Sequence, residues 1–212
     1  MFCGILYGTC VLLVFAASTD SAELSVGPGK DFARIEQAVA KAQPGDTILV
    51  FPQPDNKPYE RPAISVTKAR LTMRSAAPAG QRVPLCGDGF DYSGRGSVPR
   101  AIFQFNKGAN GCVLDGFELY GAHNDSHNGA GVRINQANDI VVRNCQIHDN
   151  DMGIMSNGDG TAATAVNQLI ESCLIHSNGN MKDPGYNHNL YLGGTSVRMP
   201  ASTEHHPRLG AV

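Results

Sequence analysis

The amino-acid sequence predicts an all-β protein built from stacked, repeated coils. The segment DIVVRNCQIHDN, which begins at Asp139, returns as NQLIESCLIHSN at Asn167, and the interval from Cys145 to Cys173 is 28 residues. A repeat that keeps side-chain size and polarity at each position is typical of solenoids. Glycine is frequent, at 24 of 212 residues, and aromatic residues make up only 7%. This composition favours tight turns between short strands over a helical bundle.

Chain length and charge favour a single domain without a basic surface field. The 212 residues carry a formal net charge of -2, and 17% of them are charged. This length is enough for one domain with a real core, whereas nucleic acid would need a basic patch that the composition does not provide. Nucleic acid is therefore not an expected partner.

The first residues resemble an export signal. The apolar run ILYGTCVLLVFAA covers 5–17 and is followed by small and polar residues through Ala22, although no Lys or Arg precedes it. Such a run is too short to span a bilayer comfortably. We expect a signal peptide over 1–22, and hence a secreted or periplasmic protein with no membrane attachment after its removal.

The next segment predicts a strand, a helix and a second strand. Asp31 is the expected N-cap of a helix over 31–43, which Pro44, Gly45 and Asp46 would end. The apolar positions follow a 3.6-residue period: Phe32, Ile35, Ala38, Val39 and Ala42. We expect this helix to cap the apolar end of the first coil, which would otherwise face solvent.

Each 28-residue coil divides into three short strands. Segments around Val113, Val141 and Leu169 come first, those around Leu119, Ile147 and Ile175 second, and GVRIN, GIMS and NLYL third. The intervals vary only before the third strand, so the strands keep register while one corner of the coil changes length.

The sequence resembles the right-handed parallel β-helix of the pectate-lyase-like superfamily in three features. These are the cap, the coils of pattern n-x-x-V/I-x-n-C/F-x-I, and the Gly-Ile or Asn-Leu strands. The resemblance covers roughly 23–194, and leaves 195–212 as an irregular tail without an alternating apolar strand. It implies that outward residues of one strand stack into a flat sheet, along which the substrate lies between walls of loops. The fold carries lyases, hydrolases, epimerases, phage tailspikes and adhesins, so it does not fix the activity.

The repeated Cys, Ile and His positions fit this architecture. Cys145 and Cys173 are expected to face inward, and His148 and His176 to lie at the coil corner with their rings bonded to backbone. Asn150 and Asn178 follow at the same interval and are expected to form a buried amide ladder. The cysteines expected in the mature chain are Cys86, Cys112, Cys145 and Cys173, which allow either two disulfides or four buried thiols.

One outward column of side chains stands out in the third strands. If GVRIN, GIMS and NLYL stack, Val132, Ile154 and Leu190 point inward. The outward column is then Arg133, Met155 and Tyr191.

The loops that enter these strands concentrate the titratable residues. Cleavage of a uronate polysaccharide by β-elimination needs a group that neutralises the carboxylate, a base and an acid. We expect Arg133 to pair with the sugar carboxylate, Lys182 or His188 to act as base, and Tyr186 to donate the proton. Asp149 and Asp151 are hard oxygen ligands that could hold Ca²⁺. Substrate contacts are expected from Tyr191, Asn189, His123 and His127.

Other chemistries are weaker alternatives. A glycoside hydrolase needs two carboxylates across the bond, which Asp149 or Asp151 could form with Asp125 or Asp183. An epimerase is disfavoured because Gly185 stands where the Asp-Pro-His pattern of β-helical epimerases has histidine.

The sequence therefore predicts an exported β-helix protein that acts on or binds an acidic polysaccharide, with lyase-like activity as the leading hypothesis. The alternative is a glycan-binding or surface module without catalysis. Because a further coil or cap is due after Gly194, an inactive, truncated form is a related expectation.

Overall fold

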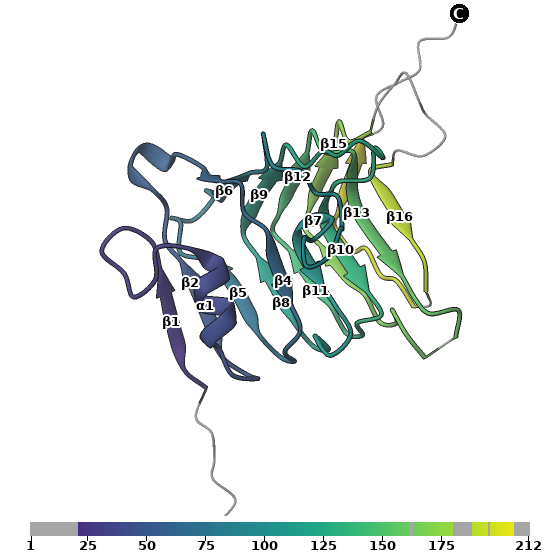
Figure 1. The fold of residues 1–212 in the computed structure, drawn as a ribbon, viewed down its shortest axis with the longest axis horizontal. Helices are drawn as coiled ribbons and strands as arrows, with labels where there is room; N and C mark the ends of the chain where they lie inside the picture. Colours follow the sequence, from purple (N-terminus) through teal and green to yellow (C-terminus); the bar gives the residue numbers. More distant parts are fainter. Residues whose placement is uncertain (1–20, 162, 180–187, 195, 206–212) are drawn as a thin grey trace, which may run out of the picture.

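The computed structural model describes residues 21–161, 163–179, 188–194 and 196–205. Over this part of the chain it contains seventeen strands, the helix α1 (Ile35–Lys41) and the short 3-10 helix η1 (Pro54–Asn56). The strands stack side by side from the N-terminal to the C-terminal end of an elongated body (Figure 1).

Every strand pairing within the named strands is parallel, and the strands form three sheets. The first sheet contains β1 (Glu23–Val26), β2 (Thr47–Val50), β5 (Thr72–Ser75), β8 (Val113–Asp115), β11 (Val141–Arg143) and β14 (Leu169–Glu171). The second contains β3 (Tyr59–Glu60), β6 (Val83–Cys86), β9 (Phe117–Tyr120), β12 (Gln146–His148), β15 (Leu174–His176) and β17 (Thr203–His205). The third contains β4 (Ile64–Val66), β7 (Ala101–Phe105), β10 (Ala130–Asn135), β13 (Met152–Asn157) and β16 (Leu190–Leu192).

From β2 to β16 the chain visits the three sheets in the same rotation. The described residues complete five coils, of which the last contains β14, β15 and β16. The predicted division of each coil into three strands is confirmed, since Val113, Val141 and Leu169 lie in register. Two of the five coils precede the recognisable 28-residue repeat.

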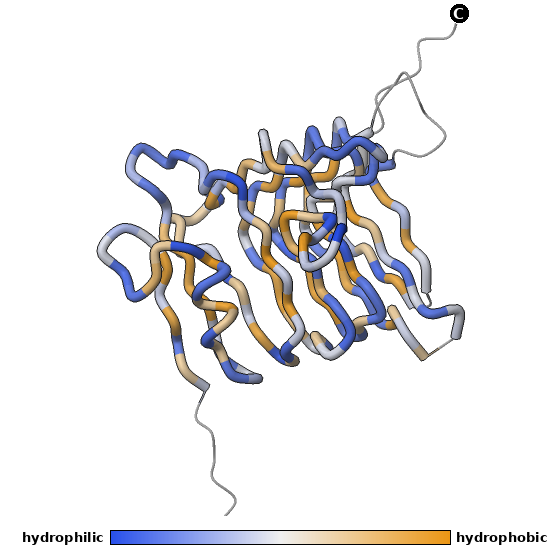
Figure 2. Tube along the Cα trace, viewed as in Figure 1, coloured by the Kyte–Doolittle hydropathy of each residue, from blue (hydrophilic) through white to orange (hydrophobic). Residues whose placement is uncertain are grey.

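The core consists of stacked apolar columns inside the coils. Leu119, Ile147 and Ile175 form one column from the second sheet, and each is fully buried. Along the chain, apolar residues of the strands alternate with hydrophilic turns at the edges of the body (Figure 2). Burial of such columns is the main stabilising contribution, because each coil alone cannot enclose an apolar interior.

The corner between the first and second sheets is fixed by left-handed backbone. Gly116, Asn144 and Ser172 occupy this corner in three successive coils, with φ of 85°, 55° and 52°. Glycine adopts this conformation without a steric penalty, and asparagine tolerates it better than most residues. The repeat therefore includes a backbone requirement as well as a pattern of apolar side chains.

The opposite corner, between the second and third sheets, contains the predicted asparagine ladder. The Asn150 side-chain amide donates to the His148 carbonyl at 2.8 Å and to Oδ1 of Asn178 at 2.9 Å. The Asn178 amide repeats the pattern, donating to His176 O at 3.0 Å and to Oδ1 of Asn189 at 2.9 Å. All three asparagines are buried, so the ladder satisfies turn carbonyls that water does not reach.

Two glycines make room for this ladder at the start of the third strands. A Cβ at Gly153 would lie 2.9 Å from Nδ2 of Asn178, and one at Gly131 would lie 2.7 Å from Cγ2 of Ile147. The glycines that open GVRIN and GIMS are thus required by the close approach of the buried corner.

The N-terminal helix is shorter than the predicted 31–43, and Asp31 does not cap it. Instead, the Asp31 carboxylate accepts a 2.6 Å hydrogen bond from the Ser25 hydroxyl, which fixes the preceding turn. Gln37 accepts a hydrogen bond from the backbone N–H of Arg34, at the helix start. Ile35, Ala38 and Val39 are buried in the main core, so the helix covers the first coil as expected.

The segment after Gly194 differs from the irregular tail that the sequence predicts. Strand β17 pairs with β15, and an isolated bridge joins Arg198 to Leu169 of the first sheet. The hydroxyl of Ser202 donates to Ile170 O at 2.9 Å. Such a strand is hard to predict because backbone pairing with the previous coil, and not its own apolar pattern, defines it.

Substitution of Lys68 is expected to loosen the helical cap. Its ammonium group donates to the carbonyls of Val39, Ala40 and Ala42, at 3.3, 2.8 and 2.6 Å. These carbonyls lie at the C-terminal end of α1, where a cation also stabilises the helix dipole. We expect Lys68→Met to lower the free energy of unfolding by roughly 1–3 kcal/mol in urea titrations. The exposed Lys107, substituted in the same way, is the control; an equal loss in both variants would contradict the assignment.

Candidate functional site

The outer face of the third sheet presents one continuous column of side chains. Arg133 lies in register with Met155 on one side and with Gln104 on the other, and Tyr191 and Ser65 extend the column at its two ends. Val132 and Ile154 are fully buried beneath it. The predicted inward and outward columns are therefore confirmed by the strand register.

A polar recess of about 400 Å³ lies over one end of this column. Its floor contains outward residues of β4, β7 and β10, and the loop before β7 forms its wall. The lining residues are Ser65, Gly94, Gly96, Ser97, Val98, Arg100, Gln104, Asn106, Arg133 and Asn135. Polar side chains dominate the lining, and none of these residues carries a carboxylate.

The side chains in the recess are held by a hydrogen-bond chain. Arg133 Nε donates to Oδ1 of Asn135 at 3.0 Å, and the Asn135 amide donates to Oδ1 of Asn106 at 3.2 Å. Asn106 in turn donates to the Ser65 hydroxyl at 2.8 Å and accepts from Gln104 at 3.0 Å. The network orients one guanidinium and several amides before any ligand arrives.

The recess has an unbalanced positive charge. Burial lowers the pKa of Arg133, and the nearby charge of Arg100 lowers it further. Within the described residues the structure gives neither guanidinium an ion pair with a carboxylate. Two close guanidinium groups without a counter-ion favour binding of an anion.

The far end of the same column is aromatic. Tyr191 is 50% exposed, and its ring stacks on that of His188 with 5.9 Å between centroids and 15° between planes. Asn189 lies between them in sequence but is buried in the asparagine ladder. Asn189 is therefore not accessible for the substrate contact that the sequence predicts.

The loop that precedes β10 is organised around Asp151. One carboxylate oxygen lies 2.9 Å from Nδ1 of His123, and the other accepts hydrogen bonds from the backbone N–H groups of Asn124 and Gly129. The hydrogen bond to Asp151 is the main reason that the pKa of His123 is raised. His127 is exposed in this loop, with φ of 52°.

The expected Ca²⁺ site does not fit the described geometry. Both carboxylate oxygens of Asp151 are used by the loop, and the carboxylate of Asp149 lies 2.7 Å from Nδ1 of His148. Among the described residues no group of three or more His, Cys, Asp or Glu is placed to hold a metal ion. The two aspartates thus have separate partners: Asp151 bonds to the loop before β10, and Asp149 to His148.

The two corner histidines form a ring stack on the outer face of the second sheet. Tyr120, His148 and His176 stack with centroid distances of 5.3 and 5.1 Å. The prediction that these rings bond to backbone is wrong for His148, which lies 3.0 Å from a carboxylate oxygen of Glu118 and 2.7 Å from Asp149. His176 lies beside side chains too, at 3.3 Å from the Gln146 amide.

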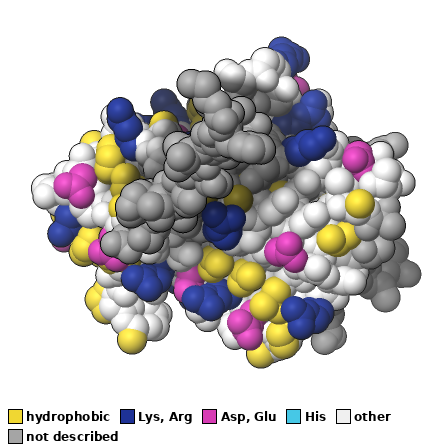
Figure 3. All heavy atoms as spheres, turned by 90° about the horizontal axis from the view of Figure 1, so that it is seen from below, with side chains coloured by type: hydrophobic (Ala, Val, Ile, Leu, Met, Phe, Trp, Pro, Cys, Tyr) yellow, Lys and Arg dark blue, Asp and Glu magenta, His cyan; other side chains and the backbone are white. Residues whose placement is uncertain are grey.

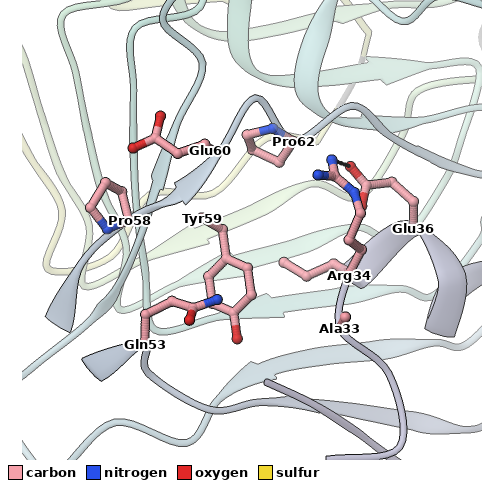
Figure 4. Close-up of a pocket in the computed structure, with 9 residues that line it drawn as sticks. Ala33, Arg34, Glu36, Gln53, Pro58, Tyr59, Glu60 and Pro62 are labelled. Atoms are coloured by element: carbon pink, nitrogen blue, oxygen red, sulfur yellow. Dashed lines mark hydrogen bonds and ion pairs between the residues drawn. The ribbon is translucent and has the colours of Figure 1, made fainter. Parts of the chain in front are cut away.

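A smaller recess of about 220 Å³ lies between the helical cap and β3 (Figure 4). Glu36 lines it, but its carboxylate is already bonded to Arg34 and to the backbone N–H of Ala63. Tyr59 likewise donates its hydroxyl proton to Phe51 O at 2.7 Å. The groups in this recess hold the cap to the first coil, so it is a weaker candidate site than the recess on the third sheet.

Lys182, Tyr186 and Asp183 lie outside the described residues, as does the expected signal peptide apart from its last two positions. Sequence reasoning missed Arg100, Gln104, Asn106 and Asn135. Gln104 was detectable, because AIFQF precedes GVRIN by one coil, whereas Arg100 comes from a loop without a repeat.

Charges of both signs are mixed on the face shown in Figure 3, in keeping with the formal net charge of -2. Within the described residues no helix is long and apolar enough to cross a membrane.

Replacement of Asp151 is expected to change both the pKa of His123 and the amide exchange of the loop that precedes β10. In Asp151→Asn the charged partner is lost, so the pKa of His123 should fall toward its ordinary value, measured by NMR titration of the ring. Amide exchange at Asn124 and Gly129 should accelerate, because their N–H groups lose a carboxylate acceptor. Asp125→Asn, in the same loop but exposed, is the matched control, and an unchanged His123 titration in Asp151→Asn would contradict the account.

The contact between Glu118 and His148 is expected to stabilise the fold over a limited pH range. The pKa of His148 is raised, chiefly by Glu118, and that of Glu118 is lowered, chiefly by His148. The contribution should be fullest at roughly pH 4.5–6.5, between the ordinary values of the two groups. It should decline at higher pH as His148 loses its proton, and at lower pH as Glu118 gains one.

Urea unfolding of the wild type and of Glu118→Gln across pH 3–9, roughly the range that spans both ordinary pKa values, measures this contribution. The difference in unfolding free energy should peak inside the window. A difference that does not change with pH would show that the ion pair contributes nothing.

No family profile matches the chain, and no curated protein matches it either. Several solved structures match the chain. YbhC of Escherichia coli matches with a TM-score of 0.53 and 14% identity, over 83% of this chain and 55% of that one. Pectin methylesterase PemA of Erwinia chrysanthemi matches with a TM-score of 0.50 and 13% identity, over 76% and 51%.

A pectin methylesterase variant in complex with a hexasaccharide has a TM-score of 0.50 and 12% identity, over 88% of this chain and 66% of that one. The chain thus spans between half and two thirds of the length of these structures. At such identities the likeness concerns the fold, and it agrees with the three parallel sheets and the regular rotation of the coils. The chain therefore has a right-handed parallel β-helix fold.

Proposed function

We propose that the outer face of the third sheet binds an acidic polysaccharide. The observation that carries this proposal is the pair Arg100 and Arg133, which share one recess without a carboxylate among its lining residues. Guanidinium groups bind carboxylates with two parallel hydrogen bonds, and the uronates of an acidic glycan supply carboxylates at regular intervals.

The rest of the recess suits the hydroxyl groups of sugars. Gln104, Asn106 and Asn135 each offer amide donors and acceptors, and Ser65 adds a hydroxyl. Because the recess extends over β4, β7 and β10, it suits a polymer that lies across the strands. Tyr191, further along the column, provides an exposed ring on which a sugar can stack.

The comparisons support a carbohydrate partner. Two of the solved structures with this fold are named pectin methylesterases, and one of them is a complex with a hexasaccharide. Pectin is therefore the first polymer to test. A partner of this kind is also consistent with the proposed export of the chain to the periplasm or the cell exterior.

Lyase-like activity is the second candidate. It is favoured by the position of Arg133, which could neutralise a uronate carboxylate during β-elimination. The base must reach the proton on the carbon next to that carboxylate. Among its described lining residues the recess has no Lys, His, Asp or Glu. His188 stacks on Tyr191, and Tyr191 lies two strands from Arg133, about 10 Å away. The activity would thus depend on Lys182, His188 and Tyr186, with no step through Ca²⁺.

The binding proposal predicts a selective loss in two arginine variants. Arg133→Gln and Arg100→Gln should each weaken binding to polygalacturonate by roughly 10- to 100-fold, the loss expected for a charge-assisted contact. Binding should also weaken at high salt and be weak for fully methyl-esterified pectin. Isothermal titration calorimetry or affinity electrophoresis measures both effects.

Arg74→Gln is the matched control, because Arg74 is an exposed arginine of the first sheet. Equal binding of esterified and unesterified polymer, or equal losses in Arg74→Gln and Arg133→Gln, would reject the proposed site. The same samples test the second candidate: a rise in ultraviolet absorbance from unsaturated product, lost in His188→Ala or Lys182→Ala, would establish a lyase.

A further inference from the structure

Cys145 and Cys173 occupy equivalent positions in the fourth and fifth coils. Each follows the left-handed residue of its corner, and the backbone N–H of Leu174 donates to Cys145 O at 2.9 Å. Neighbouring parallel strands lie about 4.8 Å apart. Their Cα atoms should therefore fall within the range of about 4.4–6.8 Å that disulfides span.

The two thiols reach the same stretch of β11. Cys145 Sγ lies 3.2 Å from the carbonyl oxygen of Arg143, and Cys173 Sγ lies 3.5 Å from that of Val142, the residue before it. Both side chains are buried, at 0% and 3% exposure, and both thiols are free. The sulfur of Cys173 also lies 3.3 Å from Glu171 O in its own coil, so it is in contact with both this coil and the preceding one, where Cys145 lies.

The two thiols also influence each other's pKa. A hydrogen bond between them lowers the pKa of Cys173, whereas burial, followed by this same bond, raises that of Cys145. The mutual effect on pKa is a second indication that the two sulfur atoms are neighbours.

The other two described cysteines lack this arrangement. Cys112 Sγ lies 3.2 Å from the carbonyl oxygen of Lys68, and Cys86 lies beside Asp88 on the second sheet. Among the described contacts neither has a thiol partner. They provide internal controls of the same chemistry in the same chain.

We propose that Cys145 and Cys173 form a disulfide that cross-links the fourth and fifth coils when the chain meets a disulfide oxidant. While the chain is still open to solvent, the thiolate of one of the two cysteines attacks one sulfur of the oxidant and releases its first thiol. The thiolate of the other cysteine then attacks the protein sulfur of this mixed disulfide and releases the second thiol. The two cysteines lose two electrons and two protons, and one oxidant disulfide becomes two thiols.

The test uses the full chain, denatured and reduced, then refolded with oxidised and reduced glutathione and blocked with an alkylating reagent. Trypsin leaves both cysteines in one peptide, because no Lys or Arg lies between Arg143 and Lys182. Cleavage after Glu171 then separates them. We expect the two cysteine peptides to remain joined. Their joint mass should be lower by two hydrogen atoms than the sum of the two reduced, unalkylated peptides, while Cys86 and Cys112 should be alkylated.

Thermal unfolding gives a second readout. Reductant should lower the Tm of the oxidised protein by roughly 5 °C or more, and should have no effect on Cys145→Ala/Cys173→Ala. Cys86→Ala/Cys112→Ala should keep the response. Full alkylation of Cys145 and Cys173 after oxidative refolding, or a disulfide between other pairs, would overturn the proposal even if a variant failed to fold.

Discussion

The register of the parallel strands is the constraint on which the rest of the structure depends. Each strand bonds to its equivalent in the next coil, so a shift by one residue would exchange the buried and exposed side chains of the whole coil. The left-handed corner at Gly116, Asn144 and Ser172 and the ladder of Asn150, Asn178 and Asn189 fix this register on both sides of the second sheet. The columns of core and surface residues follow from these two corners.

The same strand register aligns the outward side chains of the third sheet into one column. Arg133 and Gln104 lie side by side because their strands are in register, and amide side chains at the ends of the same strands complete the network. The sheet supplies rigid positions, while Arg100 comes from the loop before β7. A binding face of this kind needs little rearrangement on contact with a ligand, which limits the entropic cost of binding.

The sequence predicted the fold well where residues repeat at a fixed interval. Cys145 with Cys173, Ile147 with Ile175, and Arg133 with Met155 and Tyr191 were all placed correctly by counting. It failed where three-dimensional neighbours decide: Asp31 bonds to Ser25, His148 to carboxylates, and β17 forms by pairing with β15. The outward column was foreseen, but the recess was not, because Arg100 lies on a loop without repeat spacing.

The asparagine ladder has a consequence for how such a protein can change. It closes the coil beneath the loops that lead into the third sheet, so those loops rest on a corner whose hydrogen bonds are already satisfied. Insertions or exchanges of loop sequence above the ladder would leave the strand register intact. The scaffold therefore separates the part that can acquire new specificity from the part that must be conserved for folding, and loop grafting between coils is a practical route to new ligands.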